Sequence, residues 1–176
     1  MRVLVLGAGR NGAQGMTVRD AVTSAPILDA EWITLDMRPT VGADLVCTLG
    51  RDAIALPDDS VDFAFALQLL EHIGRQGETG EWFHFWGELY RVLTPGGRLQ
   101  FECPHWNSVW CWADPTHTRA ISQDVFAYLD QNSYRRGGAI PDFRPPCDFV
   151  LRSWGVEGDW CGGVLEARKP FTPYWE

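Results

Sequence analysis

The chain has 176 residues, of which 45% are hydrophobic and 22% charged, and its formal net charge is −8. A chain of this length predicts one domain, residues 1–176, that buries about 70% of its unfolded surface without covalent staples. The negative charge excludes non-specific binding to a nucleic-acid backbone, which requires a basic surface. No signal peptide is visible and no apolar run reaches the roughly 18 residues of a membrane span, so we expect a cytoplasmic protein without a membrane partner.

Five cysteines are scattered along the chain and no two of them form a CxxC pair. An odd, widely spaced set is typical of reduced thiols in a cytoplasmic protein. Cys103, His105, Cys111 and His117 can be drawn as a zinc site, but their spacing fits no common ligand pattern. We therefore expect no metal centre.

The first part of the chain alternates short apolar runs with turns. Pro57-Asp58-Asp59-Ser60 has the composition of a turn. Residues 13–25 predict only a weak helix, because Gly15, Thr17 and Thr23 interrupt it. The runs that we predict as buried strands are 2–6, 32–36, 43–48 and 61–66.

The second part begins with the clearest helix, predicted over residues 81–93. Its apolar residues recur at helical spacing, and Pro95-Gly96-Gly97 ends it before a fifth strand at 98–103. Residues 149–156 and 163–169 predict an antiparallel hairpin, because the short connection 157–162 cannot make a parallel crossover. Strands that alternate with helices predict a doubly wound, mostly parallel α/β sheet that ends in this hairpin.

A glycine-rich segment follows the first strand and an acidic residue ends the second. Gly7-Ala8-Gly9 allows a tight turn and a close approach of the backbone to a ligand. Asp36 stands where a carboxylate can accept hydrogen bonds from both ribose hydroxyls. The two features predict a nucleoside site without identifying the nucleoside, because dinucleotide-binding proteins share them.

Three blocks, in order and spacing, resemble the class I S-adenosyl-L-methionine (SAM)-dependent methyltransferases. They are Val3 to Gly12, Trp32 to Asp36, and a back half that contains "Leu-Glu-His-Ile" at 70–73 and "Leu-Thr-Pro-Gly-Gly" at 93–97. The resemblance spans roughly residues 1–105 and implies a seven-stranded-type sheet, SAM as cofactor and methyl transfer. An NAD-type oxidoreductase remains the weakest alternative, because 176 residues leave no room for its second nucleotide-binding half.

The resemblance also implies which residues hold the cofactor. The adenine edge has two registers, Thr48-Leu49 or Asp52-Ala53, and the "Asp-Ala-x-x-Leu-Pro" context favours the second. The predicted cofactor-binding residues are Gly7, Ala8, Gly9, Asp36, Met37, Asp52, Ala53, Leu67 and Gln68.

Methyl transfer requires an acceptor held in line with the sulfonium, exclusion of water and sometimes a base. The acceptor should lie over the carboxyl ends of the fourth and fifth strands. The segment Asp114 to Arg119 resembles a "DPTHxR" element of some small bacterial and phage-type relatives. The candidate catalytic residues are His105, His117, Asp114 and His72, with His117 or His105 ahead of His72 as the base.

Trp106, Trp110 and Trp112 crowd into the loop after the fifth strand. Three tryptophans on a loop predict a wall or lid over an acceptor. The predicted substrate-binding residues are these three tryptophans, Glu71 and Arg119. The expected acceptor is an O or N atom of a small molecule, glycan or peptide group. A homodimer interface, or a non-catalytic SAM-fold module that binds a partner through this loop, is the alternative use of the tryptophans.

Overall fold

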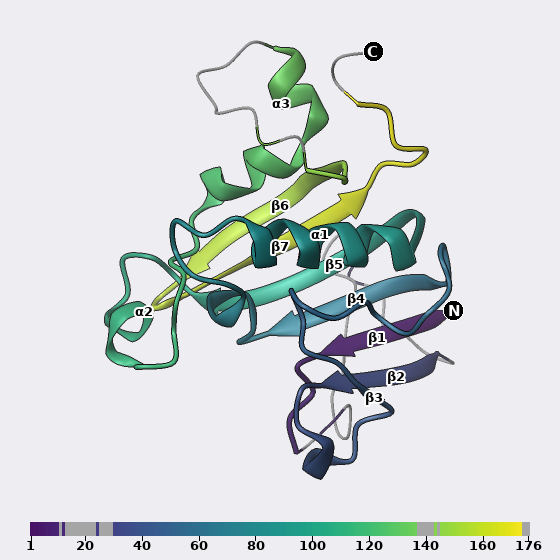
Figure 1. Ribbon diagram of the computed structural model, residues 1–176. Coiled ribbons are helices and arrows are strands. Elements are labelled where there is room, and N and C mark those ends of the chain that lie inside the picture. The colour runs from purple at the N-terminus through teal and green to yellow at the C-terminus, as the bar shows by residue number, and fades with distance from the viewer. Residues whose placement is uncertain (11, 13–23, 25–29, 137–142, 144, 174–176) are drawn as a thin grey trace.

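The computed structural model describes residues 1–10, 12, 24, 30–136, 143 and 145–173, and these form a seven-stranded mixed sheet (Figure 1). The strand order is β3-β2-β1-β4-β5-β7-β6. The strands from β3 to β5 pair in parallel, whereas β7 is antiparallel to both β5 and β6. This arrangement confirms the predicted doubly wound, mostly parallel sheet with a carboxy-terminal antiparallel hairpin.

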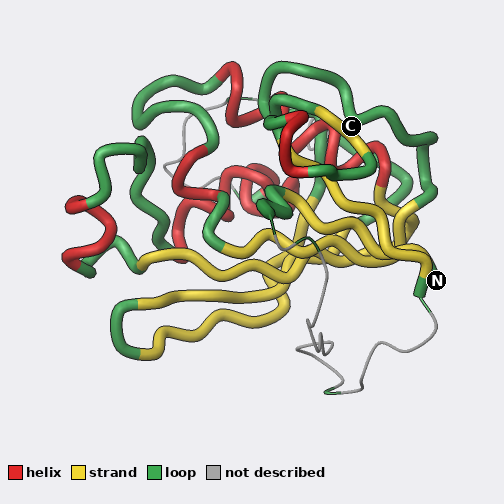
Figure 2. The backbone as a smooth tube through the Cα atoms, turned by 90° about the horizontal axis from the view of Figure 1, so that it is seen from below, coloured by secondary structure: helices red, strands yellow, loops and turns green. Residues whose placement is uncertain are grey.

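The strands are β1 (Arg2–Leu6), β2 (Glu31–Asp36), β3 (Leu45–Val46), β4 (Val61–Leu67), β5 (Leu93–Pro104), β6 (Phe149–Glu157) and β7 (Trp160–Ala167). The α-helices of the described residues are α1 (Gly80–Val92), α2 (Val109–Ala113) and α3 (Gln131–Arg135). Three 3-10 segments are η1 (Pro39–Val41), η2 (Leu70–His72) and η3 (Gln123–Leu129). Figure 2 shows most of the described helical segments on one side of the sheet.

Three elements differ in extent from their predictions. The third strand is only Leu45–Val46, because the Thr34 amide donates to the Asp44 side chain (2.8 Å) instead of pairing further along β3. The fifth strand starts directly at Leu93, and residues 94–97 form an irregularity within it. The hairpin turn is the pair Gly158 and Asp159, shorter than predicted because Glu157 already pairs with Trp160. The helix predicted at 13–25 lies, apart from Ser24, outside the described residues.

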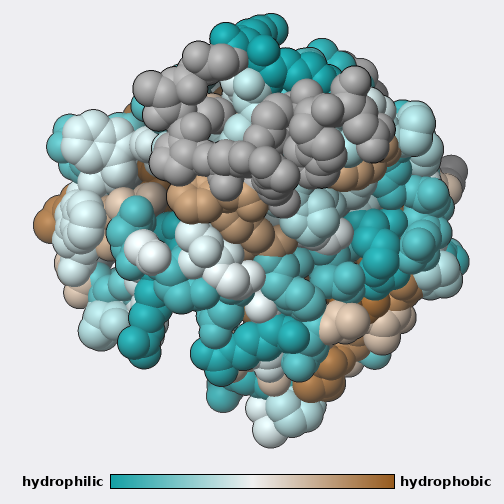
Figure 3. Space-filling model, turned by 45° about the horizontal axis from the view of Figure 1, so that its top comes forward, coloured by the Kyte–Doolittle hydropathy of each residue, from teal (hydrophilic) through white to brown (hydrophobic). Residues whose placement is uncertain are grey.

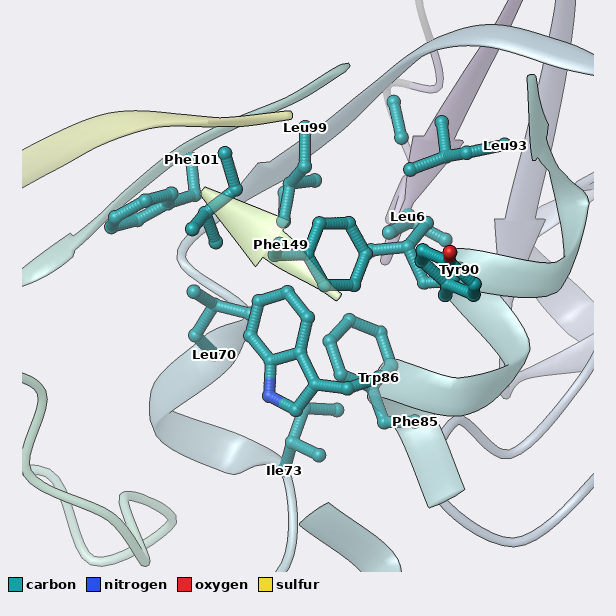
Figure 4. Packing of buried hydrophobic residues seen from close by; sticks show 14 of the residues in the cluster. Leu6, Leu70, Ile73, Phe85, Trp86, Tyr90, Leu93, Leu99, Phe101 and Phe149 are labelled. Carbon is teal, nitrogen blue, oxygen red and sulfur yellow. The ribbon is translucent and has the colours of Figure 1, made fainter. Parts of the chain in front are cut away.

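The core is an aromatic cluster between α1 and the sheet (Figure 4). Trp86 of α1 is fully buried, with its ring centroid 5.0 Å from that of Phe85 and 5.5 Å from that of Phe149. Leu70, the first residue of η2, and Ile73, which directly follows η2, lie against the same indole in Figure 4. The core therefore fixes the position of the segment that directly follows β4.

On the side shown in Figure 3, hydrophobic residues form separate patches within a mostly hydrophilic surface. Within the described part of the chain, no helix has the length and apolar character to span a bilayer.

We expect Trp86→Ala to lower the free energy of unfolding by about 3–5 kcal/mol, because the cavity left in this aromatic cluster cannot collapse fully. Trp160→Ala is the matched control, since Trp160 is 40% exposed at the start of β7. Denaturant unfolding of both variants checks this expectation. Equal losses for the two variants would contradict the central position of Trp86.

Candidate active site

The glycine loop follows β1 and folds against the end of β2. Gly7 and Gly9 have φ angles of +64° and +59°, which residues with a side chain rarely adopt. A Cβ at Gly7 would also lie only 3.0 Å from a methyl of Leu69. The Gly9 amide donates to Asp36 Oδ2 (2.9 Å) and the Ala8 amide to the Leu35 carbonyl (3.0 Å), so the turn is held by β2.

Asp36, the last residue of β2, is the ionised group beside the glycine loop. Its side chain is buried, and its Oδ1 accepts hydrogen bonds from the Arg38 backbone amide (2.9 Å) and Nε (3.3 Å). Burial raises the pKa of Asp36, but the hydrogen bonds from Arg38 and Gly9 outweigh it and hold the pKa below its ordinary value. Asp36 is therefore a carboxylate with acceptor capacity left for a ligand.

A cleft of about 570 Å³, which we call the first cleft, opens beside Asp36 at the carboxyl ends of β1, β2 and β4. Of the two registers left open by the sequence, Thr48 and Leu49 line it. Asp52 instead accepts a hydrogen bond from the Thr48 amide (2.7 Å), and neither Asp52 nor Ala53 lines the cleft. The other residues that line it include Gly7, Asp36, Met37, Gln68, Leu69 and His72.

Some predicted cofactor residues lie around the cleft rather than in its lining. Ala8, Gly9 and Leu67 are not among the lining residues, although a Cβ at Gly9 would meet nothing within 4 Å and so faces open space. Gln68 does line it, in a left-handed conformation with φ +53° at the end of β4. Sequence reasoning missed Leu69, whose apolar side chain gives no functional signal.

The structure brings Glu71, His72 and His117 together into a cluster, which we call the Glu-His cluster. One donor atom from each residue lies within 4.8 Å of the others, and the two imidazole centroids are 4.8 Å apart. His117 Nε2 lies 3.9 Å from Glu71 Oε1 and 3.8 Å from Asp114 Oδ2. The cluster and Asp114 thus meet, although Asp114 lies 42 positions after His72 in the sequence.

The backbone of the segment 114–119 docks onto the loop that follows β4. The Thr118 and Arg119 amides both donate to the Glu71 carbonyl (2.9 and 3.1 Å). Asp114 Oδ1 accepts from the Thr116 amide (2.8 Å) and hydroxyl (2.6 Å), which closes a turn just before His117. These bonds place the His117 ring against Glu71.

Arg119, predicted to contact the acceptor, anchors this docking. Its guanidinium donates from Nε to the Ile73 carbonyl (3.1 Å) and from Nη2 to the Arg75 and Glu78 carbonyls (2.8 Å each). The same group lies 4.3 Å over the Trp82 ring. A planar cation with several donors can hold a loop in this way, so the contacts describe Arg119 as a positioning residue.

Glu71 is a buried carboxyl group with unusual surroundings. The residue is 1% exposed, and neither carboxylate oxygen has a hydrogen-bond partner among the described residues. Burial, reinforced by the negative charge of Asp114, raises its pKa to about 7, although its own backbone amide acts in the opposite direction. Glu71 therefore changes charge near neutral pH.

Backbone carbonyls fix the tautomers of both histidines in the cluster. His72 Nδ1 lies 3.1 Å from the Thr116 carbonyl and His117 Nδ1 lies 2.9 Å from the Trp110 carbonyl. A carbonyl oxygen can only accept, so we assign the proton of each neutral ring to Nδ1. Each Nε2 then carries a free lone pair.

A second cleft, also about 570 Å³, lies on the other side of the histidine pair. Its lining includes Trp106, Trp112, Cys111, His117, Thr118 and Arg119. Trp106, Trp110 and Trp112 are 48%, 52% and 70% exposed, so the tryptophan loop is a surface wall and not core. His72 lines the first cleft and His117 the second, so the histidine pair stands between them.

His105, the other leading candidate for a base, lies apart from this pair. Its backbone amide donates to the Asp159 carbonyl (2.9 Å), its ring is 5.5 Å from that of Trp106, and it lines neither cleft. A larger cavity of about 690 Å³ lies near Asp59 and Pro95, at the amino end of β4. Ligands of such sheets bind at the carboxyl ends, so that cavity is not the site.

Residues 20–101 match the sequence profile of a family described as a methyltransferase domain. The match covers the strands β2 and β4 and the η2 turn that follows β4. This match and the seven-stranded sheet together support an assignment to the class I methyltransferases. No curated protein matches this chain in sequence.

Solved structures share the fold at low identity. A SAM-dependent methyltransferase from Methanosarcina mazei aligns with a TM-score of 0.59 and 13% identity, covering 95% of this chain and 92% of its own. A methyltransferase from Haloferax volcanii, solved with the Trm112 activator, gives 0.60 and 14% identity over 95% and 82% of the two chains. The [4+2]-cyclase SpnF gives 0.57 and 14% identity over 95% and 74%, so the fold also carries other chemistry.

The raised pKa of Glu71 predicts a pH-dependent stability. The Glu71 carboxyl releases its proton near pH 4.5 in the unfolded chain and near pH 7 in the folded chain. Its contribution to stability is therefore complete below pH 4.5 and is lost as the pH rises toward 7. The wild type should therefore lose up to about 3 kcal/mol of its free energy of unfolding between pH 5 and 8, and Glu71→Gln should abolish this loss. Unfolding in a chelator-containing buffer at several pH values measures this slope.

Glu157→Gln is the matched control for this slope, because Glu157 is an exposed carboxylate at the end of β6. This variant should keep the pH dependence of the wild-type stability. A slope unchanged in Glu71→Gln would show that Glu71 titrates alike in the folded and unfolded chains.

Proposed function

We propose that this methyltransferase binds SAM in the first cleft and transfers its methyl group to an O or N atom of a small molecule, glycan or peptide group held in the second cleft. The observation that carries the proposal is the position of the histidine pair, with one ring lining each cleft. A methyl group on SAM in the first cleft and an acceptor in the second would therefore meet beside this pair.

The residues of the first cleft fit SAM. Gly7 keeps the space beside Leu69 free, and the open side of Gly9 leaves room for the methionine end of the cofactor. The ionised Asp36 would accept from the ribose hydroxyls, with the exposed Arg38 side chain moving aside. Thr48 and Leu49 would contact the adenine, in place of the Asp52-Ala53 register favoured by the sequence.

The second cleft supplies the acceptor side. Its tryptophans offer flat apolar surfaces, and aromatic faces also attract cationic groups such as amines. Of the Glu-His cluster, His117 lines this cleft, and it would face the acceptor hydroxyl or amine that must lose a proton. When bound, SAM supplies a methyl group on a sulfonium, and the chain needs only to align the acceptor, exclude water and take this proton.

A second candidate function rests on the exposed tryptophans. Trp106, Trp110 and Trp112 together with Val109 present apolar side chains to solvent around α2. A partner protein that covers them would make this loop a docking surface, as in the alternative of a non-catalytic module. The neighbour from Haloferax volcanii was solved with an activator protein, so a methyltransferase of this fold can work with a partner.

We expect Asp36→Ala to weaken SAM binding roughly 10- to 100-fold, because a hydrogen bond to a charged group contributes about 1.5–3 kcal/mol. Titration calorimetry with SAM measures this change. Asp44→Ala is the matched control, an exposed acid that accepts from Thr34 on the same strand pair. Wild-type affinity in Asp36→Ala would remove the ribose contact and with it the proposed orientation of the cofactor.

We expect His117→Ala to lower methyl transfer by roughly 10²–10⁴-fold while SAM still binds, because the cluster that receives the acceptor proton is broken. Transfer of a labelled methyl group from SAM into the small molecules, glycans and peptides of a cell extract measures turnover. His84→Ala on α1 is the matched control. If His105→Ala abolishes transfer and His117→Ala does not, the proton acceptor lies at the end of β5 instead.

A further inference from the structure

We propose that the Glu-His cluster binds a divalent transition-metal ion through Glu71, His72 and His117. The sequence predicted no metal centre, and nothing in the family match requires one. The binding of the ion stands on the geometry of the three side chains. Its role rests on the proposed methyl transfer: with both imidazoles and Glu71 bound to it, the ion would hold the acceptor O or N atom and, as a Lewis acid in place of a free base, ease the loss of its proton.

The donor set has the chemistry of a transition-metal site. Two imidazole nitrogens and one carboxylate oxygen are ligands that zinc, iron and similar ions accept, and sites of three such protein ligands leave at least one position open. In each histidine, Nδ1 donates to a backbone carbonyl, which leaves Nε2 as the donor atom. Metal-ligating histidines are oriented by second bonds of this kind.

The separations suit an ion with little rearrangement. Ligand distances of about 2.0–2.2 Å place neighbouring donors roughly 3–4 Å apart. The donor atoms of the cluster lie within 4.8 Å of one another, and His117 Nε2 is 3.9 Å from Glu71 Oε1. His72 is the exposed member, so a small rotation of its ring can close the remaining distance.

A second, independent observation is that the Glu71 carboxylate is buried without a hydrogen-bond partner. Glu71 is 1% exposed and both its oxygens lack a hydrogen-bond partner among the described residues, whereas nearly all buried polar groups have one. No lysine or arginine of the described part of the chain forms an ion pair with it. The nearby Arg119 donates to backbone carbonyls instead. A cation between the carboxylate and the imidazoles would satisfy this group.

The same geometry rejects the zinc site that the sequence allowed one to draw. That set joined Cys103, His105, Cys111 and His117, but His105 lines neither cleft. Cys103 instead faces Cys161 across β5 and β7, with 3.6 Å between the sulfur atoms. Of the four, only His117 belongs to the Glu-His cluster.

The test uses Co²⁺ added to the chelator-treated, full-length protein, because its visible absorption bands report ligand type and geometry. We expect one Co²⁺ per chain, with nitrogen and oxygen ligation. His72→Ala should weaken binding by at least about 10–100-fold, the loss observed when even an outer partner of a ligand is removed. Because His72 is exposed, this variant should fold, and near-UV circular dichroism verifies that it does.

His84→Ala is the matched control and should bind Co²⁺ like the wild type. Absence of stoichiometric binding, binding unchanged in His72→Ala and in Glu71→Gln, or bands of thiolate ligation would each overturn the proposal. SAM affinity is measured on the same chelator-treated samples. SAM binding without Co²⁺ binding overturns the metal site alone, whereas loss of SAM binding in the wild type overturns the proposed function.

Discussion

The site depends on one buried cation. Arg119 donates to three carbonyls of the loop 73–78 and lies over Trp82, so it ties the segment after β5 to the segment after β4 and to α1. Two backbone amides of the segment 114–119 complete the tie at the Glu71 carbonyl. This docking helps to hold His117 against Glu71, because the two residues lie on separate connections.

The two buried carboxylates of the site show how surroundings divide their roles. Asp36 receives hydrogen bonds from Gly9 and Arg38, which outweigh the effect of burial and lower its pKa. Glu71 is buried without such donors, and its pKa rises to about 7. The first is a permanent anion suited to hydroxyl groups, and the second is a group that exchanges protons or accepts a cation near neutral pH.

The order of the elements explains why these groups meet at one edge of the sheet. Parallel pairing of β1, β2, β4 and β5 brings their carboxyl ends to the same side, where the connecting loops are free to carry polar residues. The aromatic core around Trp86 packs against Leu70 and Ile73 at the η2 turn (Figure 4). The first cleft therefore opens over the inner strands, and the second opens toward the tryptophan loop at α2.

The sequence alone determined the strands, α1 and the terminal hairpin, because hydrophobic periodicity and Gly or Pro punctuation are local signals. It also placed Gly7, Gly9 and Asp36 correctly at strand ends. It favoured Asp52-Ala53 over Thr48-Leu49 for the adenine edge, whereas Thr48 and Leu49 line the cleft, because that lining depends on a turn closed by Asp52. It could not separate His117 from His105, or show that Glu71 is buried without partners. Those facts arise from the docking of two loops more than 40 residues apart, and only the tertiary structure decides which distant side chains share one enclosed, poorly solvated space.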